Sequence, residues 1–230
     1  MKGAVISDLH LFSGRCRPIE ELHRLIDHQL DCLVLNGDIF DFKWNQHQDR
    51  QDGFQEASNI LRQLCEKFPH LRIIYLSGNH DQEAHFDPFL NQLSSYFSTF
   101  SWRSSFFQIG TKLFHHGDLF FKNQKERPMI KPFQTKSARL YSAYKKITDA
   151  HINRLAELPL RPSFVCPYIE KHWQEDFDQR GVTDIYFGHT HVPFENFQVK
   201  QRRYHNSGTF IKNQQYKFIQ FTTGENDAEF

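Results

Sequence analysis

The feature that most constrains the fold is a series of short apolar runs, each followed at once by a polar cluster. Five such runs occur: Ala4-Val5-Ile6 before Ser7-Asp8-Leu9-His10, Cys32-Leu33-Val34-Leu35 before Asn36-Gly37-Asp38, Ile73-Ile74-Tyr75-Leu76 before Ser77-Gly78-Asn79-His80-Asp81, Lys112-Leu113-Phe114 before His115-His116-Gly117-Asp118, and Ile185-Tyr186-Phe187 before Gly188-His189-Thr190-His191. Unbroken apolar runs of this length are typical of strands buried on both faces, and glycine is typical of the turns that follow them. We therefore expect buried strands whose carboxyl ends carry polar side chains.

Helical patterns lie between the first strands. The apolar residues Ile19, Leu22, Ile26 and Leu30 follow Pro18 at helical spacing, and Phe54, Ala57, Leu61, Leu64 and Phe68 do the same before Pro69. Alternating strands and helices predict βαβ units and, taken alone, an α/β fold with a plain parallel sheet. Ligand sites in such folds gather at the carboxyl ends of the strands, where all the polar clusters lie.

Length and composition predict a single globular domain spanning residues 1–230. The formal net charge is +1, which argues against a nucleic-acid partner. The four cysteines show no CxxC spacing, and no apolar stretch approaches the roughly 20 residues that cross a bilayer. We expect reduced thiols and a cytoplasmic protein, with peripheral contact to the inner face of a membrane as an open alternative.

The segment from about Phe120 to Trp173 differs from the rest. Between Lys122 and Lys146 it holds eight basic residues and one acid, and helical apolar spacing follows from Leu140 to Leu158. We interpret residues 120–173 as a mainly helical cap inserted between two core strands. Its basic and aromatic character suits an anionic lipid-linked substrate or a membrane surface, although a solvated helical face explains it equally well.

The strand ends together offer side chains that bind metals: Asp8, His10, Asp38, Asn79, His116, His189 and His191. Mixed nitrogen and oxygen ligands suit Mn, Fe, Zn, Ni or Co rather than Ca. Seven ligands are too many for one tetrahedral zinc but fit two cations that share a carboxylate. In the DxH and HxH sequences, the two side chains of an extended segment would point the same way, so both can reach one metal centre.

Each of these short sequences has an ordinary explanation when it is taken alone. A lone DxH occurs often by chance, and the histidines of HxH can simply share a strand face. The order DxH, GDxxD, GNHD, HGD and GHTH, each after an apolar run, is not explained in that way. This order resembles the calcineurin-like metallophosphoesterase superfamily, and the resemblance covers Ile6 to about Gly208.

The resemblance implies a four-layer α-β-β-α sandwich of two mixed sheets with a helical insertion, in place of one parallel sheet. It also implies that Asp8, His10 and His191 bind the first metal, that Asp38 bridges, and that Asn79, His116 and His189 bind the second. His116 is preferred to His115 because the family ligand directly precedes Gly-Asp. Manganese is the expected metal for both positions, with Fe, Zn, Ni and Co as alternatives.

The resemblance further implies a metal-dependent phosphoric ester or anhydride hydrolase that uses metal-activated water on a small phosphorylated substrate. His80 is expected to contact the phosphate and to protonate the leaving group. Asn79 is expected to bind metal through its amide oxygen and the substrate through its NH₂ group. Either Asp81 or Asp41 is expected to orient an imidazole, and the sequence leaves that choice open.

The sequence gives less information about which subgroup of the superfamily the chain resembles. Phe42 stands where Ser/Thr protein phosphatases carry arginine, which argues against that group. The Asp8-Leu9-His10-Leu11 block, the insertion and the GHTH block are similar to the UDP-2,3-diacylglucosamine pyrophosphatases, whose insertion caps the active site and holds acyl chains. That similarity makes Lys136 and Arg139 candidates for substrate binding. His80 departs from the arginine common in that group, so a generic phosphodiesterase or phosphomonoesterase acting on nucleotides or other small substrates is the alternative.

Two other classes share this fold. A nuclease usually carries additional DNA-binding domains, for which 230 residues leave little room. A non-catalytic scaffold such as the retromer subunit is expected to have lost metal ligands or the catalytic histidine. This chain keeps all the candidate ligands and His80, which favours an enzyme.

Overall fold

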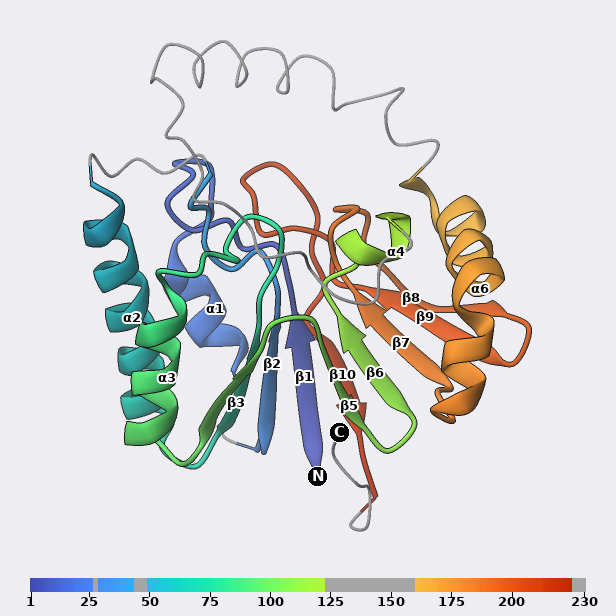
Figure 1. Ribbon diagram of the computed structural model, residues 1–230, viewed down its shortest axis with the longest axis horizontal. Coiled ribbons are helices and arrows are strands. Elements are labelled where there is room, and N and C mark those ends of the chain that lie inside the picture. The colour runs from blue at the N-terminus through green and yellow to red at the C-terminus, as the bar shows by residue number, and fades with distance from the viewer. Residues whose placement is uncertain (27–28, 44–48, 123–159, 225–230) are drawn as a thin grey trace, which may run out of the picture.

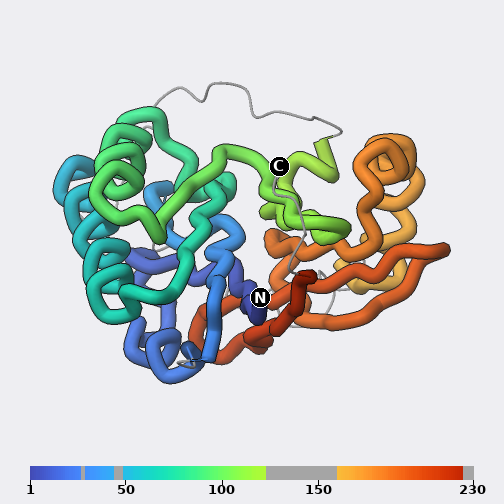
Figure 2. Tube along the Cα trace, turned by 90° about the horizontal axis from the view of Figure 1, so that it is seen from below, coloured from blue at the N-terminus to red at the C-terminus, as the bar shows by residue number. Residues whose placement is uncertain are grey.

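The apolar runs form strands that are buried on both faces, as their composition predicts. The computed structural model describes residues 1–26, 29–43, 49–122 and 160–224. Two five-stranded mixed sheets pack face to face, and helices cover the outer face of each (Figures 1 and 2). The four-layer α-β-β-α sandwich is therefore confirmed, and the plain parallel sheet is wrong.

The first sheet has the strand order β10-β1-β2-β3-β4. Its parallel strands are β1 (Lys2–Ile6), β2 (Cys32–Asn36), β3 (Arg72–Leu76) and β4 (Phe100–Arg103), and β10 (Ile219–Thr222) pairs antiparallel with β1. Val5 lies opposite Val34 in the register of β1 and β2. This register brings the ends of β1, β2 and β3 to the same edge.

The second sheet has the strand order β5-β6-β7-β9-β8. Its members are β5 (Phe106–Ile109), β6 (Lys112–His115), β7 (Asp184–Phe187), β9 (Arg202–Asn206) and β8 (Phe194–Val199). The three central strands β6, β7 and β9 run parallel, and the two outer strands are antiparallel to their neighbours. Consequently the polar ends of β6 and β7 also share one edge.

The helices lie in two groups. Helices α1 (Ile19–Leu25), α2 (Arg50–Lys67) and α3 (Asp87–Tyr96) lie on the first sheet's side, whereas α4 (Asp118–Lys122) and α6 (Pro162–Gln179) lie on the second sheet's side (Figures 1 and 2). None of the helices in the described ranges is long and apolar enough to cross a membrane.

Alternation along each strand divides the core into layers. In β1, Val5 points between the sheets and joins Phe114 and Tyr186 of the second sheet. Its neighbours Ala4 and Ile6 point outward and pack with the residues of the outer helices. Because successive strand side chains point to opposite faces, a strand between two apolar layers must be apolar throughout. This explains the unbroken runs in the sequence.

Two expected boundaries differ from the structure. Helix α1 ends at Leu25, because Ile26 already has an extended backbone, although Ile26 and Leu30 stay buried. The apolar spacing therefore continues past the helix end to supply the core, not to extend the helix.

The other difference concerns the insertion. Helix α6 includes the last residues of the expected insertion, and the side chains of Cys166, Ile169 and Trp173 on this helix pack into the core beside the second sheet. Phe120 joins the same core cluster. Both described ends of the expected cap are thus parts of the sandwich. The remaining residues of the segment, 123–159, lie outside the described residues, and Lys136 and Arg139 lie among them.

Candidate metal centre

The two sheets bring their polar strand ends to one edge of the sandwich. Asn36, at the end of β2, holds the sheets together there, because its side-chain NH₂ donates to the carbonyl oxygens of His115 and Tyr186, each at 3.2 Å. Buried amide groups of this kind must be hydrogen-bonded to be tolerated. The ends of β2, β6 and β7 are thereby locked in register across the interface between the sheets.

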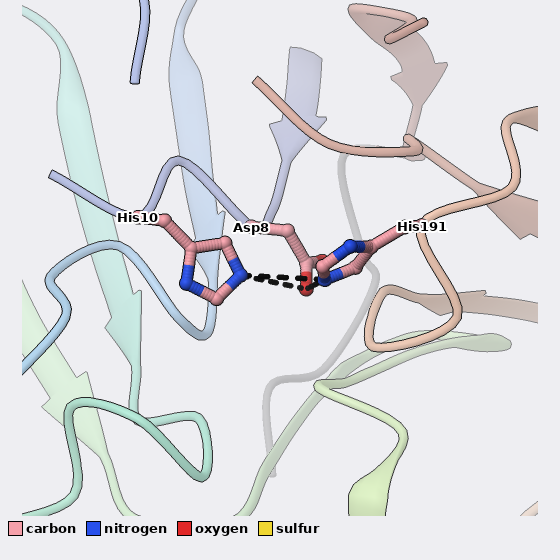
Figure 3. Close-up of side chains that lie close together, drawn as sticks. All are labelled: Asp8, His10 and His191. Carbon is pink, nitrogen blue, oxygen red and sulfur yellow. Dashed lines mark hydrogen bonds and ion pairs between the residues drawn. The ribbon is translucent and has the colours of Figure 1, made fainter. Parts of the chain in front are cut away.

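Asp8, His10 and His191 form a first cluster (Figure 3). The Asp8 Oδ1 atom lies 3.2 Å from Nε2 of His191 and 3.8 Å from Nε2 of His10. The two imidazole nitrogens are 3.3 Å apart. Three ligand atoms of the types that bind transition metals therefore converge on one point.

Asp38, His116 and His189 form a second cluster. Nε2 of His116 lies 3.2 Å from Asp38 Oδ2, and the ring centroids of His116 and His189 are 5.3 Å apart. Nδ1 of His116 donates to the carbonyl oxygen of Asn36 at 3.2 Å, which directs Nε2 toward Asp38.

Asp38 connects the two clusters. The same Oδ2 atom that faces His116 is 3.9 Å from Nε2 of His10, which belongs to the first cluster. Its other oxygen, Oδ1, accepts a hydrogen bond of 2.7 Å from the backbone N–H of His80. Asp38 therefore has the position that a carboxylate shared between two cations requires.

The chemistry of these residues fits a pair of divalent cations. Oδ1 of Asn79 is buried and has no hydrogen-bond partner among the described residues. A buried polar atom without a partner is costly in free energy, and a cation would satisfy it. Asn79 lies between Gly78 and His80 in the loop that contacts Asp38. All of the expected ligands therefore lie in or beside the two clusters.

Backbone conformation places most of these side chains. Asp8, His10, Asp38, His189 and His191 all have positive φ angles, between 48° and 65°. This left-handed conformation costs roughly 1–3 kcal/mol for a residue with a side chain and is found preferentially at functional sites. The expectation that the DxH and HxH segments are extended is wrong. His189 and His191 lie in different clusters, whereas Asp8 and His10 lie in the same one.

Buried charges set the protonation of the site. Burial alone would raise the pKa of Asp38, but the nearby His116 outweighs it and holds the pKa well below its usual range. Burial disfavours a charge on His116 too, yet Asp38 raises the pKa of His116 to about 10. Burial and the neighbouring His116 lower the pKa of His189 to about 4. Asp38 is therefore ionised and His189 is neutral, which are the forms that bind metals, whereas His116 carries a proton that a cation bound at Nε2 would displace.

His80 lies beside the clusters and touches Asp41. Nδ1 of His80 is 3.0 Å from Asp41 Oδ1, and Nδ1 of His10 is 3.4 Å from Asp41 Oδ2. One carboxylate thus orients both the expected catalytic histidine and a histidine of the first cluster. These contacts use the Nδ1 atoms, so we assign the His10, Asp41 and His80 group as a hydrogen-bonded network and not as a third metal site.

Asp81 has a different place from the one expected as an alternative. Its Oδ2 atom accepts hydrogen bonds from the backbone N–H of Ile39 and the hydroxyl of Tyr75, each at 2.7 Å, and Oδ1 accepts from the backbone N–H of Gly78. These partners are backbone groups and a phenol rather than an imidazole. Asp81 ties the loop after β2 to the loop after β3, and the structure places Asp41 against His80.

Three supporting residues were not singled out from the sequence. Asn206 donates to the carbonyl oxygen of Gly188 at 2.8 Å, Ser207 lies 2.6 Å from the hydroxyl of Ser7, and the Thr209 hydroxyl donates to the carbonyl oxygen of Asp8 at 2.9 Å. The Asn206-Ser207-Gly208 segment begins at the end of β9. Its position directly after a strand is the same signal that marked the five other loops.

Two motif glycines are required by close approach. A Cβ atom on Gly78 would overlap the backbone nitrogen and carboxylate of Asp38, and one on Gly188 would overlap the carboxylate of Asp8. Because both carboxylates lie directly on glycine backbone, alanine at either position would displace a metal-binding group. The glycines of GNHD and GHTH therefore shape the site.

The chain matches the calcineurin-like phosphoesterase family over residues 1–193. A comparison with curated proteins gave no significant match.

Solved structures with a similar course of the chain include a dimetal phosphatase from Danio rerio, with 12% identity, a TM-score of 0.45 and coverage of 92% of this chain and 88% of that one. They also include a single mutant of Vps29 from Entamoeba histolytica, with 14% identity, a TM-score of 0.44 and coverage of 98% and 87%. The family match alone spans most of the sequence and all the clustered residues, and the chain therefore belongs to the calcineurin-like phosphoesterase family.

Proposed function

We propose that this protein hydrolyses a phosphoester or phosphoanhydride with the help of two divalent cations. The observation that carries the proposal is the shared position of Asp38, whose Oδ2 atom faces His116 of one cluster and His10 of the other. A bridging carboxylate between two nitrogen-rich clusters is the arrangement used for two-metal hydrolysis of phosphate esters.

The surrounding residues have different roles in the proposed reaction. When bound, two cations lower the pKa of water toward neutrality and stabilise negative charge on phosphate oxygens. Asp41 holds Nδ1 of His80, which leaves Nε2 as the atom that meets the substrate. Nε2 can then donate a proton to the leaving oxygen. Asn79 binds a cation through its buried Oδ1 and offers its NH₂ group to the phosphate.

Removal of metal is expected to abolish hydrolysis reversibly. Protein treated with a chelator and then dialysed should lose turnover of both bis-p-nitrophenyl phosphate and p-nitrophenyl phosphate, and Mn²⁺ should restore it. Metal should also raise the melting temperature, because cations relieve the repulsion between the buried Asp8 and Asp38. Parallel additions of Fe²⁺, Zn²⁺, Ni²⁺ and Co²⁺ would rank the metals. Full activity in metal-free protein would refute the proposal.

We further propose that the substrate resembles UDP-2,3-diacylglucosamine and that the protein acts in the cytoplasm, in peripheral contact with a membrane. The DLHL and GHTH blocks and the basic segment support this. Neutralising Lys136, Arg139 and Lys145 together by alanine is then expected to raise KM for the acylated UDP-sugar about tenfold or more and to spare bis-p-nitrophenyl phosphate, since about 1 kcal/mol per basic residue is typical at an anionic lipid surface.

A matched control is available outside the basic segment. Arg24, Arg62 and Lys67 lie on helices α1 and α2, so their replacement by alanine removes the same charge from another part of the chain. It should leave the kinetics on both substrates unchanged. An equal loss on both substrates in the first variant would contradict a lipid-linked substrate and favour the alternative, a phosphodiesterase or phosphomonoesterase acting on small phosphoesters.

A further inference from the structure

A row of aromatic side chains lies on the solvent side of α6. Phe164, Tyr168 and His172 occur at intervals of four residues and so share one face of the helix. Phe164 is 61% exposed and Tyr168 is 39% exposed, and only one other large hydrophobic residue in the described ranges, Tyr96, is exposed to this degree. Exposed aromatic residues gathered on one face are typical of binding surfaces.

This row continues toward the candidate metal centre through α4. The ring centroid of Phe121 lies 6.1 Å from that of Tyr168, and the two ring planes are inclined by only 13°. The centroid of Phe121 also lies 5.8 Å from that of His189. The ring centroids of Tyr168 and His172 are in turn 4.4 Å apart. Figure 1 shows α4 between α6 and the edge of the sandwich at which β6 and β7 end. We name Phe121, Tyr168 and His172 the aromatic ledge.

The ledge has the chemistry of a surface for a flat heterocycle. Tyr168 and His172 combine aromatic faces with polar edges, and such rings stack bases and meet their hydrogen-bonding groups. An acyl chain would be matched instead by aliphatic side chains. The aliphatic residues of α6, Val165 and Ile169, are buried against the second sheet and do not face outward.

Charge next to the ledge is consistent with a phosphorylated ligand. Lys122 follows Phe121 directly and is exposed, with its ammonium group 3.8 Å from Asp118 Oδ2, and the exposed Lys171 precedes His172 in the chain. His189 belongs to the second cluster of the metal centre and its ring contacts Phe121, so the ledge begins at the metal centre. We propose that the aromatic ledge stacks the nucleobase of a nucleotide-containing substrate while its phosphate is held at the metal centre. This inference rests on the proposed function, because the metal centre supplies one end of the site.

Two esters with the same leaving group test the ledge. p-Nitrophenyl thymidine 5′-phosphate carries a base, and methyl p-nitrophenyl phosphate does not. Tyr168→Ala is expected to raise KM about tenfold for the thymidine ester, since stacking on one aromatic ring contributes that order of affinity. It should leave kcat and the methyl ester unchanged, and Tyr168→Phe should behave as wild type. Tyr96→Ala removes an exposed tyrosine from α3 and should change neither ester.

Direct binding separates this inference from the proposed function. In calorimetric titration with thymidine 5′-monophosphate and Mn²⁺, Tyr168→Ala should weaken binding by a similar factor. If wild-type protein hydrolyses neither ester, the proposed function fails, and the titration still decides whether the ledge binds a base. Equal changes for both esters, or unaltered nucleotide binding in Tyr168→Ala, would overturn the ledge. If Tyr168→Ala raised KM for decyl p-nitrophenyl phosphate as much as for the thymidine ester, the ledge would be a general apolar surface and not a site for a base.

Discussion

Asp38→Asn is expected to lower kcat/KM for bis-p-nitrophenyl phosphate by at least about a thousandfold, because several kcal/mol of charge stabilisation in the transition state correspond to that factor. The amide can keep the hydrogen bond from the His80 backbone at the Oδ1 position. It removes the negative oxygen that faces His116 and His10. Steady-state kinetics and metal analysis of the purified variant should show loss of turnover and of bound metal with an unchanged circular dichroism spectrum.

Asp184→Asn provides a matched control for that experiment. Asp184 is equally buried, but it lies at the start of β7 and pairs with Arg203 and His205, away from the metal centre. Its replacement should lower the melting temperature and leave metal content intact. If Asp38→Asn retained wild-type turnover, or if Asp184→Asn lost metal to the same extent, the assignment of Asp38 as the shared ligand would be wrong.

His80→Ala is expected to reduce kcat by about 10²–10⁴-fold, the usual range for a lost proton-transfer group. Metal content should stay near the wild-type value, because His80 contacts Asp41 and lies outside both clusters. The loss should be greater for an alkyl phosphodiester than for bis-p-nitrophenyl phosphate, since p-nitrophenolate leaves without a proton. The measurement is kcat on both substrates, together with metal analysis of the same sample.

His85→Ala is the control for the histidine. Its side chain is 65% exposed and is paired with Glu83, so its removal should leave kcat unchanged. Loss of metal in His80→Ala would identify His80 as a ligand and contradict its assignment as a proton donor. An equal decrease on both substrates would keep a role in binding phosphate and exclude protonation of the leaving group.

Five strands of the sandwich, β1, β2, β3, β6 and β7, could be predicted from the sequence because each of them is covered on both faces. Val5 and Ile6 point into different core layers, so the pattern cannot alternate and appears as a continuous run. The apolar runs did not show which strand belongs to which of the two sheets. It depends on pairings such as that of β7 with β9, which no local pattern encodes.

The candidate members of the site were visible in the sequence, and the family resemblance implied their division between two metals, but the backbone conformation was not visible. The i, i+2 spacing predicted extended DxH and HxH segments, whereas the Asp and His residues of both segments have positive φ angles. Such angles are unfavourable locally and are held by surrounding contacts, such as the hydrogen bonds from the His189 backbone to Asp8. The choice of Asp41 over Asp81 likewise depended on contacts between separate loops.

By itself, then, the sequence determined which residues are buried, where strands end, and which side chains bear the chemistry, because burial and ligand type are properties of single residues and short patterns. Only the tertiary structure decided that α6 belongs to the sandwich, that Asp41 contacts His80, and that Phe121 and Tyr168 meet beside His189. The physical reason is that these contacts join segments far apart in the chain, and their geometry follows from how two sheets pack against each other.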